Sequence, residues 1–371
     1  MQRKRSSLSR IALSVVALGA LVVSYSPSMK AQDRQGVSFV YVMSNKSPNN
    51  SVIQYLRAQN GSLLWVREVL TGGRGTGATG VDPLGSQDSL VLSGDGHLLL
   101  AVNAASNDVS VLQLVNGRLI LRDKERSGGI FPNSVALFGD LVYVLNTKGS
   151  SPHINGFRLD PHGLLHTIPG SRVNLPAGSG GANDIRFAED GTKLLVTVSG
   201  TNQILVFEVA DSGVAGVPTP QMSAGDSPFG IRFGRNGVAI VTEAAGSVSS
   251  YSFTPTDMLE VISAAVSDTQ TASCWISLNR SATNAYVSNT GSGTISSYQI
   301  DGSGNLTLMN AVAANTGGAP IDSSLSRDSK FMYVLDSAQG RIVILKVNAG
   351  SLTQIGSVSP LPTSIQGIAA Q

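Results

Sequence analysis

The feature that most constrains this chain is an internal repeat with a period of 45 to 50 residues. Each copy opens with a short apolar strand followed by a polar turn that contains Gly, Asp or Asn. The apolar residues that anchor these strands, spaced by 45, 50, 46, 45 and 47 positions, are Leu92, Leu137, Phe187, Phe233, Leu278 and Leu325. The C-terminal SIQGIAA supplies another such strand, in which Ala370 follows Leu325 by 45 positions. Repeats of this length are typical of architectures built from one supersecondary unit.

Three further strands follow in each copy. A second, mostly apolar strand ends in a short polar residue, as in LLLAVN (98–103). A third alternates apolar and polar residues with period two, as in DVSVLQL (108–114), which is typical of half-buried strands. A fourth follows a tight turn, and the Asn-Gly pairs at 60–61 and 116–117 favour type I′ hairpins, in which both central residues take positive φ. Four antiparallel strands repeated at this period predict propeller blades.

The strand counts predict how the ring closes. Seven second and third strands are present, the first pair at 38–56, but only six first strands lie between residues 88 and 329. The seventh first strand is the C-terminal one, so we expect it to complete the blade begun near Ser38. With 371 residues, of which 42% are hydrophobic and 13% charged, the chain can bury a substantial core. We therefore predict an all-β, seven-bladed propeller as a single domain over residues 32–371, with almost no helix.

Residues 1–31 have the composition of a secretory signal peptide. Residues 1–10 are basic, residues 11–25 are almost continuously apolar, and small residues precede a cleavage position after Ala31. An uncleaved anchor is the alternative, but 15 apolar residues are short for a bilayer span of about 20. We expect cleavage and export to a periplasm or the medium, without membrane association afterwards. A single cysteine allows no intramolecular disulfide.

The net charge and the positions of the histidines limit which classes of binding partner are expected. Residues 1–31 hold five basic and no acidic residues, and without them 21 Lys and Arg remain against 24 Asp and Glu, a net charge of −3. A mildly acidic chain has no general electrostatic reason to bind nucleic acid, and we expect a monomer. His162 and His166 fall across a hairpin, so their spacing does not place both rings on one helix face. We expect no metal and no cofactor.

Two other motifs favour structural interpretations. The stretch Gly75 to Gly80 matches GxGxxG but runs into Val81-Asp82-Pro83 instead of opening a helix, so we expect a loop between blades. Cys274, with no histidine nearby in sequence, is expected to be a small buried side chain. The residues that end the second strands are short and polar, and we expect them to bond nearby backbone groups: Asn45, Asn103, Asn146, Ser199, Thr242, Asn289 and Asp336.

The blades resemble the lactonase-type seven-bladed propeller family, which includes 6-phosphogluconolactonase and the fungal 3-carboxymuconate lactonizing enzyme. The resemblance rests on the Tyr-Val-x-Asn strand ends (Tyr143–Asn146 and Tyr286–Asn289), on GSGTISSYQIDGSGNLTL (291–308) and on PAGSGGANDIRF (176–187). It spans essentially the whole chain after residue 31. The resemblance implies a propeller fold and, as an expected activity, the hydrolysis or isomerisation of a lactone.

The resemblance also implies a site, from which this chain departs in part. Family enzymes carry a Gly-Pro-Arg-His type motif and, one blade on, an Asn-Glu pair. Asn183 and Asp184 stand where the Arg and His are expected, while Thr242-Glu243 keeps the acid and loses the Asn. Glu243 is then the candidate base. The cation that an oxyanion needs would come from Arg186 or Arg232, on the expected innermost strands.

Two functions from different classes remain open. The first is an exported lactone hydrolase or muconate cycloisomerase-like enzyme that uses Glu243, Arg186 and Arg232. The second is a non-catalytic propeller that binds a protein, a glycan or a small ligand at its rim, because propellers host many unrelated functions. The candidate ligand-binding residues are Asn183, Asp184, Trp275, whose ring could stack on a ligand, and Asp322. Convergence of the charged candidates in one pocket would favour the enzyme.

Overall fold

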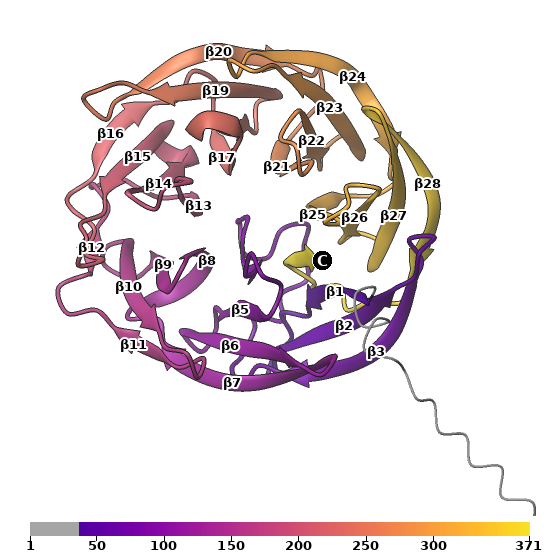
Figure 1. The fold of residues 1–371 in the computed structure, drawn as a ribbon, viewed down its shortest axis with the longest axis horizontal. Coiled ribbons are helices and arrows are strands. Elements are labelled where there is room, and N and C mark those ends of the chain that lie inside the picture. Colours follow the sequence, from indigo (N-terminus) through magenta and orange to yellow (C-terminus); the bar gives the residue numbers. More distant parts are fainter. Residues whose placement is uncertain (1–36) are drawn as a thin grey trace, which may run out of the picture. The chain divides into compact units, whose positions relative to one another are not determined.

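A computed structural model describes residues 37–371, and the predicted signal peptide lies outside the described residues. Within residues 37–371, seven antiparallel sheets surround a central axis, each with its first strand innermost (Figure 1). The innermost strands contact one another in sequence around the ring. In the same residues, no helix is long and apolar enough to cross a membrane. The predicted seven-bladed propeller is confirmed.

The seven sheets are numbered as blades 1 to 7 and their strands are given from the inside outward. Blade 1 contains β29 (Ile368–Ala370), β1 (Ser38–Met43), β2 (Ser51–Arg57) and β3 (Leu63–Leu70). Blade 2 contains β4 (Leu90–Leu92), β5 (Leu98–Asn103), β6 (Asp108–Val115) and β7 (Arg118–Arg126). Blade 3 contains β8 (Ile130–Phe138), β9 (Leu141–Lys148), β10 (His153–Leu159), β11 (Leu165–Thr167) and β12 (Val173–Asn174), the last two both paired with β10.

The remaining blades repeat this order. Blade 4 contains β13 (Ala182–Phe187), β14 (Lys193–Val198), β15 (Gln203–Glu208) and β16 (Thr219–Met222). Blade 5 contains β17 (Pro228–Phe233), β18 (Ala239–Glu243), β19 (Ser247–Phe253) and β20 (Leu259–Ser267). Blade 6 contains β21 (Ser273–Leu278), β22 (Asn284–Asn289), β23 (Thr294–Ile300) and β24 (Leu306–Asn315). Blade 7 contains β25 (Pro320–Leu325), β26 (Phe331–Asp336), β27 (Arg341–Asn348) and β28 (Ser351–Val358).

Helical structure is limited to two short 3-10 segments among the described residues. These are η2 (Ser199–Thr201) and η3 (Arg235–Gly237). Of the two predicted type I′ turns, only one has that conformation: Asn116 and Gly117 take φ of 51° and 77°, whereas at 60–61 only Gly61 has positive φ. The first hairpin closes instead by a bond from the Gly61 amide to the Ala58 carbonyl.

The ring closes as the strand counts predict. Strand β29 pairs antiparallel with β1, with Ala370 opposite Val40 and Ile368 opposite Val42. The pairing extends beyond β29, since the Gln371 amide donates to the Phe39 carbonyl at 2.9 Å. The C-terminal strand therefore gives blade 1 its innermost strand and removes a free inner edge from the blade.

The core lies largely between neighbouring blades. One continuous cluster of buried side chains includes Tyr41 of blade 1, Leu99 of blade 2 and Phe157 of blade 3. Buried tyrosine hydroxyls add bonds across the blade boundaries: Tyr143 donates to the Gly213 carbonyl at 2.8 Å, from blade 3 to blade 4. Each blade therefore depends on its neighbours for burial, which fixes the geometry of residues that face the axis.

Candidate functional site

The link between β3 and β4, residues 71–89, enters the middle of the ring and is called the axial loop (Figure 1). Its tip, residues 81–87, bonds to several blades. The Ser337 hydroxyl of blade 7 donates to the Val81 carbonyl at 2.8 Å, and the Ser86 hydroxyl donates to the Asn133 carbonyl of blade 3 at 2.8 Å. The Gln87 side chain accepts from the Ile276 amide of blade 6 at 2.9 Å. The GxGxxG stretch is thus part of a loop, as predicted, but a loop that crosses the axis.

Two predicted ligand-binding residues direct their side chains at this loop. The Asn183 amide donates to the Gly85 carbonyl at 2.8 Å, and the Trp275 indole donates to the Ser86 carbonyl at 2.9 Å. Trp275 is 2% exposed and packs edge-on against Phe229, with ring centroids 5.0 Å apart. In this conformation both side chains hold the axial loop in place.

A cavity of about 600 Å³ lies on the axis, at the face where the first and second strands of each blade are joined. It is called the axial cavity. Its lining includes Arg186, Arg232, Ser277 and Ser324 from four innermost strands, and Arg327 from the turn after β25. This size is within the range of small-molecule sites in proteins.

Asp88 is the residue around which the axial charges gather. Its carboxylate accepts from both nitrogens of the Arg232 fork, at 2.9 and 3.0 Å, and from the Arg186 guanidinium. The Asp88 side chain is 8% exposed, whereas those of Arg232 and Arg186 are 16% and 34% exposed. One buried carboxylate therefore holds two arginines that still reach the cavity.

Two further carboxyls stand beside this cluster. Asp184 accepts from the Ile231 amide at 2.9 Å and lies 3.9 Å from Arg232. Asp322 accepts from the amides of Ser323 at 2.8 Å and Ile368 at 3.2 Å. Four of the residues that the sequence singles out for chemistry or binding thus share one electrostatic environment with Asp88: Arg186, Arg232, Asp184 and Asp322.

Burial and neighbouring charges shift the pKa values of these carboxyls in different directions. Burial alone would raise the pKa of Asp88, but the adjacent Arg186 and Arg232 outweigh it and lower that pKa. Burial, with Asp88 nearby, raises the pKa of Asp184 well above its usual value. The same two causes raise the pKa of Asp322 to about 7. Groups whose pKa values are separated in this way can act as distinct acids and bases near neutral pH.

Glu243 lies apart from this cluster, at the end of β18. It is fully buried, and its carboxylate accepts from the Ser247 hydroxyl at 2.6 Å and from the Ser223 hydroxyl at 3.4 Å. Burial raises the pKa of Glu243, and the Ser247 bond offsets part of that effect. None of Glu243, Asp184 and Asp322 lines the axial cavity, but Asp184 and Asp322 contact its lining residues Arg232, Ser323 and Ile368, whereas the Glu243 carboxylate bonds none of them. The structure therefore brings the predicted arginines together with Asp184 and Asp322, and places the predicted base elsewhere.

The structure corrects the alignment of strand ends in blade 5. Glu243, rather than Thr242, pairs with Pro228 as Asn146 pairs with Pro132 and Asp336 with Pro320. Turns of different length separate the first and second strands of the blades. Counting along the sequence therefore predicted the end of β18 one residue too early, at Thr242. Glu243 is thus a regular member of the polar series that ends the second strands.

These strand-end residues pack against a recurring Ser/Thr-x-Gly motif that the sequence analysis missed. A Cβ on the motif glycine would lie within 2.5 Å of the strand-end side chain in four pairs: Gly73 with Asn103, Gly129 with Asn146, Gly225 with Glu243, and Gly318 with Asp336. The motif hydroxyl also bonds the side chain, as Thr71 does to Asn103 at 2.7 Å and Ser127 to Asn146 at 2.7 Å. Asn103 and Asn146, for which the sequence predicts a structural role, therefore connect their blades to the link before each blade. Glu243, which the sequence predicts as the base, makes the same kind of contact.

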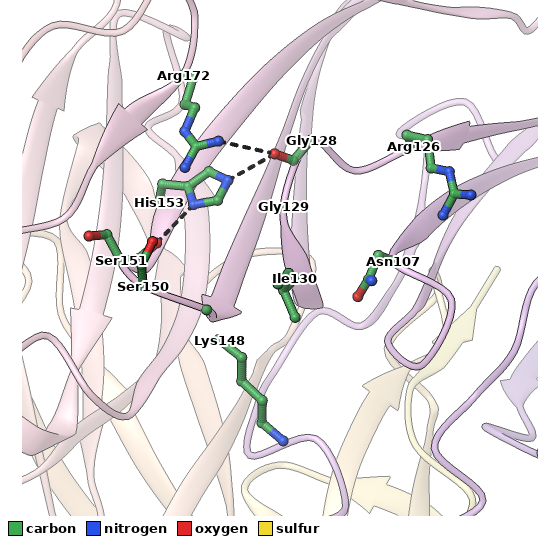
Figure 2. Close-up of a pocket in the computed structure, with 11 residues that line it drawn as sticks. Asn107, Arg126, Gly128, Gly129, Ile130, Lys148, Ser150, Ser151, His153 and Arg172 are labelled. Atoms are coloured by element: carbon green, nitrogen blue, oxygen red, sulfur yellow. Dashed lines mark hydrogen bonds between the residues drawn. The ribbon is translucent and has the colours of Figure 1, made fainter.

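A second hollow, of about 390 Å³, lies at the opposite ends of the strands, between blades 2 and 3 (Figure 2). It is called the interblade pocket. It is lined by the link Gly128–Ile130, by the turn after β9, and by Arg126, His153 and Arg172. His153 is 2% exposed, and its ring nitrogens bond the carbonyls of Ser151 at 3.0 Å and Gly128 at 3.2 Å. Sequence analysis did not single out this pocket, because its residues come from four separate segments.

The cysteine and the histidine pair offer no additional site. Cys274 is buried, as predicted, and burial raises the pKa of its thiol. His166 bonds Asp160 across its hairpin at 3.2 Å. Among residues 37–371, no group of three or more His, Cys, Asp or Glu side chains is arranged to hold a metal ion.

Comparison with known proteins supports the predicted resemblance. Residues 235–364 match the model of the family described as lactonase, 7-bladed β-propeller. No curated protein matches the chain in sequence. Sequence similarity to this family model thus covers about a third of the chain.

Solved structures share the fold at low sequence identity. The periplasmic gluconolactonase of Pseudomonas aeruginosa matches with a TM-score of 0.72 and 14% identity over 90% of this chain and 99% of its own. A proposed 6-phosphogluconolactonase of Bacteroides fragilis matches with a TM-score of 0.68 and 19% identity over 90% and 97%. A hypothetical selenium-binding protein of Sulfolobus tokodaii matches with a TM-score of 0.66 and 10% identity over 90% and 93%. The chain is a lactonase-like propeller, and at these identities the likeness shows the fold alone.

Proposed function

We propose that this chain is an exported propeller that binds a small lactone or the corresponding sugar acid in the axial cavity and hydrolyses the lactone there. One observation carries the proposal: two arginines reach a cavity of about 600 Å³, and two residues of its lining, Ser323 and Ile368, donate their amides to Asp322, a buried carboxyl whose pKa is raised to about 7. Similarity to a gluconolactonase and to the lactonase family model supports the substrate class. The apolar stretch at residues 11–25 supports export.

The chemistry assigns separate tasks to the arginines and the acid. As water adds to the lactone carbonyl carbon, negative charge develops on the carbonyl oxygen, and Arg186 or Arg232 stabilises it. Asp322 lies behind the lining residues Ser323 and Ile368, so in this proposal it acts through one intervening water: ionised Asp322 accepts a proton from the attacking water and returns one to the ring oxygen when the carbon–oxygen bond breaks. The product is a hydroxy acid whose carboxylate stays beside the arginines. Because the base must be ionised, turnover should rise with pH through about 7.

Binding without turnover is the second candidate, and a specific observation favours it. Asn183, at the position where the family resemblance implies an Arg, bonds the axial loop, and Glu243 bonds Ser247 and Ser223. Two positions of the family motifs are thus engaged in internal structure. The arginines of the axial cavity would still bind an anion such as gluconate.

The experiment measures acid release from glucono-δ-lactone, 6-phosphogluconolactone and muconolactone, above the spontaneous rate, with binding of gluconate followed by thermal shift. Asp322→Asn should lower turnover at least about tenfold, whereas Asp211→Asn, at an exposed loop position, should leave it unchanged. Equal turnover in both variants would remove Asp322 from the mechanism. Saturable stabilisation by gluconate without any turnover selects the second candidate function. If neither stabilisation nor turnover is seen, both candidate functions are excluded.

Export has its own test. The protein recovered from a periplasm or the medium should begin at Gln32, the residue after the predicted cleavage position. Recovery of the whole protein from the cytoplasm with Met1 in place would contradict export.

A further inference from the structure

We propose that the interblade pocket is a second ligand site, which binds a small hydroxylated anion such as a uronate or a sugar phosphate. The pocket lies at the opposite strand ends from the axial cavity and shares no lining residue with it. The proposal therefore stands independently of lactone hydrolysis.

The pocket concentrates positive charge in a lining without acids, although the Lys148 ammonium lies 3.6 Å from the Phe131 ring centroid and Arg126 donates to the Ser106 carbonyl at 2.9 Å. Its lining contains Arg126, Lys148 and Arg172, together with His153, and no Asp or Glu. Arg172 makes one bond, to the Gly128 carbonyl at 3.5 Å, and neither it nor Lys148 forms an ion pair with a described residue. An anion in this hollow would meet these cations without displacing an internal carboxylate.

Arg126 differs from the other two cations. It lies 3.5 Å from the carboxylate of Asp108, which Lys124 also approaches at 3.7 Å. Its side chain is 76% exposed, so that pairing is screened by solvent. Arg126 thus adds to the positive field of the pocket, while Lys148 and Arg172 carry the proposed contact.

Uncharged donors complete a lining suited to a sugar. Ser150 and Ser151 have hydroxyls at the pocket. The Asn107 side-chain oxygen accepts from the Phe131 amide at 2.9 Å, which leaves its NH₂ group available to a ligand. Figure 2 shows Asn107 and Arg126 on one side of the pocket and His153 and Arg172 on the other. Hydroxyls of a bound ring would find donors beside the cations that hold its anionic group.

The pocket walls are held by buried contacts. His153 bridges the turn after β9 and the link before β8 through both ring nitrogens. Gly129 allows that approach, because a Cβ there would lie 2.5 Å from atoms of the His153 ring and of Asn146. The two walls are thus held in a fixed relation by a side chain that is itself 2% exposed, as preorganised binding requires.

Size and net charge favour a small anion over a macromolecule. A volume of about 390 Å³ is near the lower end for ligand sites and suits one or two sugar rings. The chain without residues 1–31 carries a net charge of −3, so anions are attracted only at local groups of cations such as this one, and extended polyanions would meet repulsion elsewhere.

The test is calorimetric titration of the whole protein with D-glucuronate, glucose 6-phosphate, inorganic phosphate and neutral glucose. The pocket variant Lys148→Gln/Arg172→Gln should bind the anionic sugars at least about tenfold more weakly. The matched control Arg280→Gln/Lys330→Gln removes the same charge from exposed positions outside the pocket and should change affinity less than about twofold. Binding of glucuronate alone or of glucose 6-phosphate alone identifies the source of the anionic group.

Four results would overturn the proposal. The first is no binding of either anionic sugar at about 10 mM, a concentration far above the dissociation constants of specific small-ligand sites. The second is equal weakening in the pocket variant and the control. The third is loss of binding in Arg186→Gln with full binding in the pocket variant, which would place the sugar in the axial cavity. Inorganic phosphate bound as tightly as glucose 6-phosphate would also contradict a sugar site.

Discussion

The axial cavity and the interblade pocket both present arginines to solvent, but they differ in how those charges are paired: Arg186 and Arg232 of the axial cavity share one carboxylate, whereas Arg172 of the pocket forms no ion pair with a described residue. On the axis, Arg186 and Arg232 share the buried carboxylate of Asp88, and two further acids lie nearby. Between blades 2 and 3, Lys148 and Arg172 face a lining without any acid. Arg186 and Arg232 are therefore paired with a buried carboxylate, whereas Lys148 and Arg172 of the pocket are exposed at the surface.

This difference in pairing and burial predicts which substitutions change the stability of the fold and which change ligand affinity. A charge that is buried needs its partner, because its solvation by water has been lost. A charge at an exposed rim keeps its water and can lose its neighbours at little cost. Substitutions on the axis should therefore change the free energy of unfolding, and substitutions in the interblade pocket should change affinity alone.

The largest effect is expected from Asp88→Asn. The substitution leaves two partly buried guanidinium groups without their shared carboxylate, and breaking such an arrangement costs about 3–5 kcal/mol. Urea denaturation at pH 7 measures this loss, with Asp211→Asn as the exposed control. A loss below about 1 kcal/mol would mean that the axial charges are solvated like those of the pocket, and the comparison would fail.

A somewhat smaller effect, of opposite sign, is expected from Asp322→Asn. The folded protein holds the proton of Asp322 up to about pH 7, whereas the unfolded chain releases it near 3.8, so this group lowers wild-type stability as pH rises between those values. The variant should gain about 2–4 kcal/mol over the wild type at pH 8 and little at pH 4. A gain that is the same at both pH values would show that Asp322 does not titrate differently on folding.

Glu243→Gln should have a modest effect on stability. The amide retains the shape that packs on Gly225 and can still accept from Ser247, so a loss of about 1 kcal/mol or less is expected. If Asp322 is the base, lactone turnover stays within about twofold of the wild type. Loss of turnover at unchanged stability would instead restore Glu243 as the base that the family resemblance implies, and would move the catalytic site away from the axial cavity.

The fold followed from the sequence because each blade repeats the same local pattern. The anchors from Leu92 to Leu325 and the C-terminal SIQGIAA were sufficient to predict seven blades and the pairing of β29 with β1. The end of β18 was misplaced by one residue, because hairpin turns of unequal length hide the register from a simple count. Repetition therefore determined the architecture well and the individual strand ends less well.

The site was predictable only where the repeat itself points to the axis. Arg186 and Arg232 occupy equivalent positions on innermost strands, so their approach could be expected. Asp88 could not be found in this way, because it belongs to the axial loop and takes a positive φ of 59° just before β4. Its position depends on how residues 71–89 cross the ring, and those contacts involve blades that are distant in sequence.

The smallest effect on stability is expected from Lys148→Gln/Arg172→Gln, and it completes the comparison. Both side chains are exposed and neither forms an ion pair with a described residue, so the free energy of unfolding should change by less than about 0.5 kcal/mol. Lys148 lies 3.6 Å from the Phe131 ring centroid, and loss of that contact sets the upper limit of the change.

Urea denaturation with and without D-glucuronate measures the free energy of unfolding and its increase on ligand binding in one series. If the pair carries binding alone, glucuronate stabilises the wild type and not the variant, while the two ligand-free curves coincide. Ligand-free curves that differ by more than about 1 kcal/mol would show that these cations also belong to the structure, and the division between axis and rim would not hold.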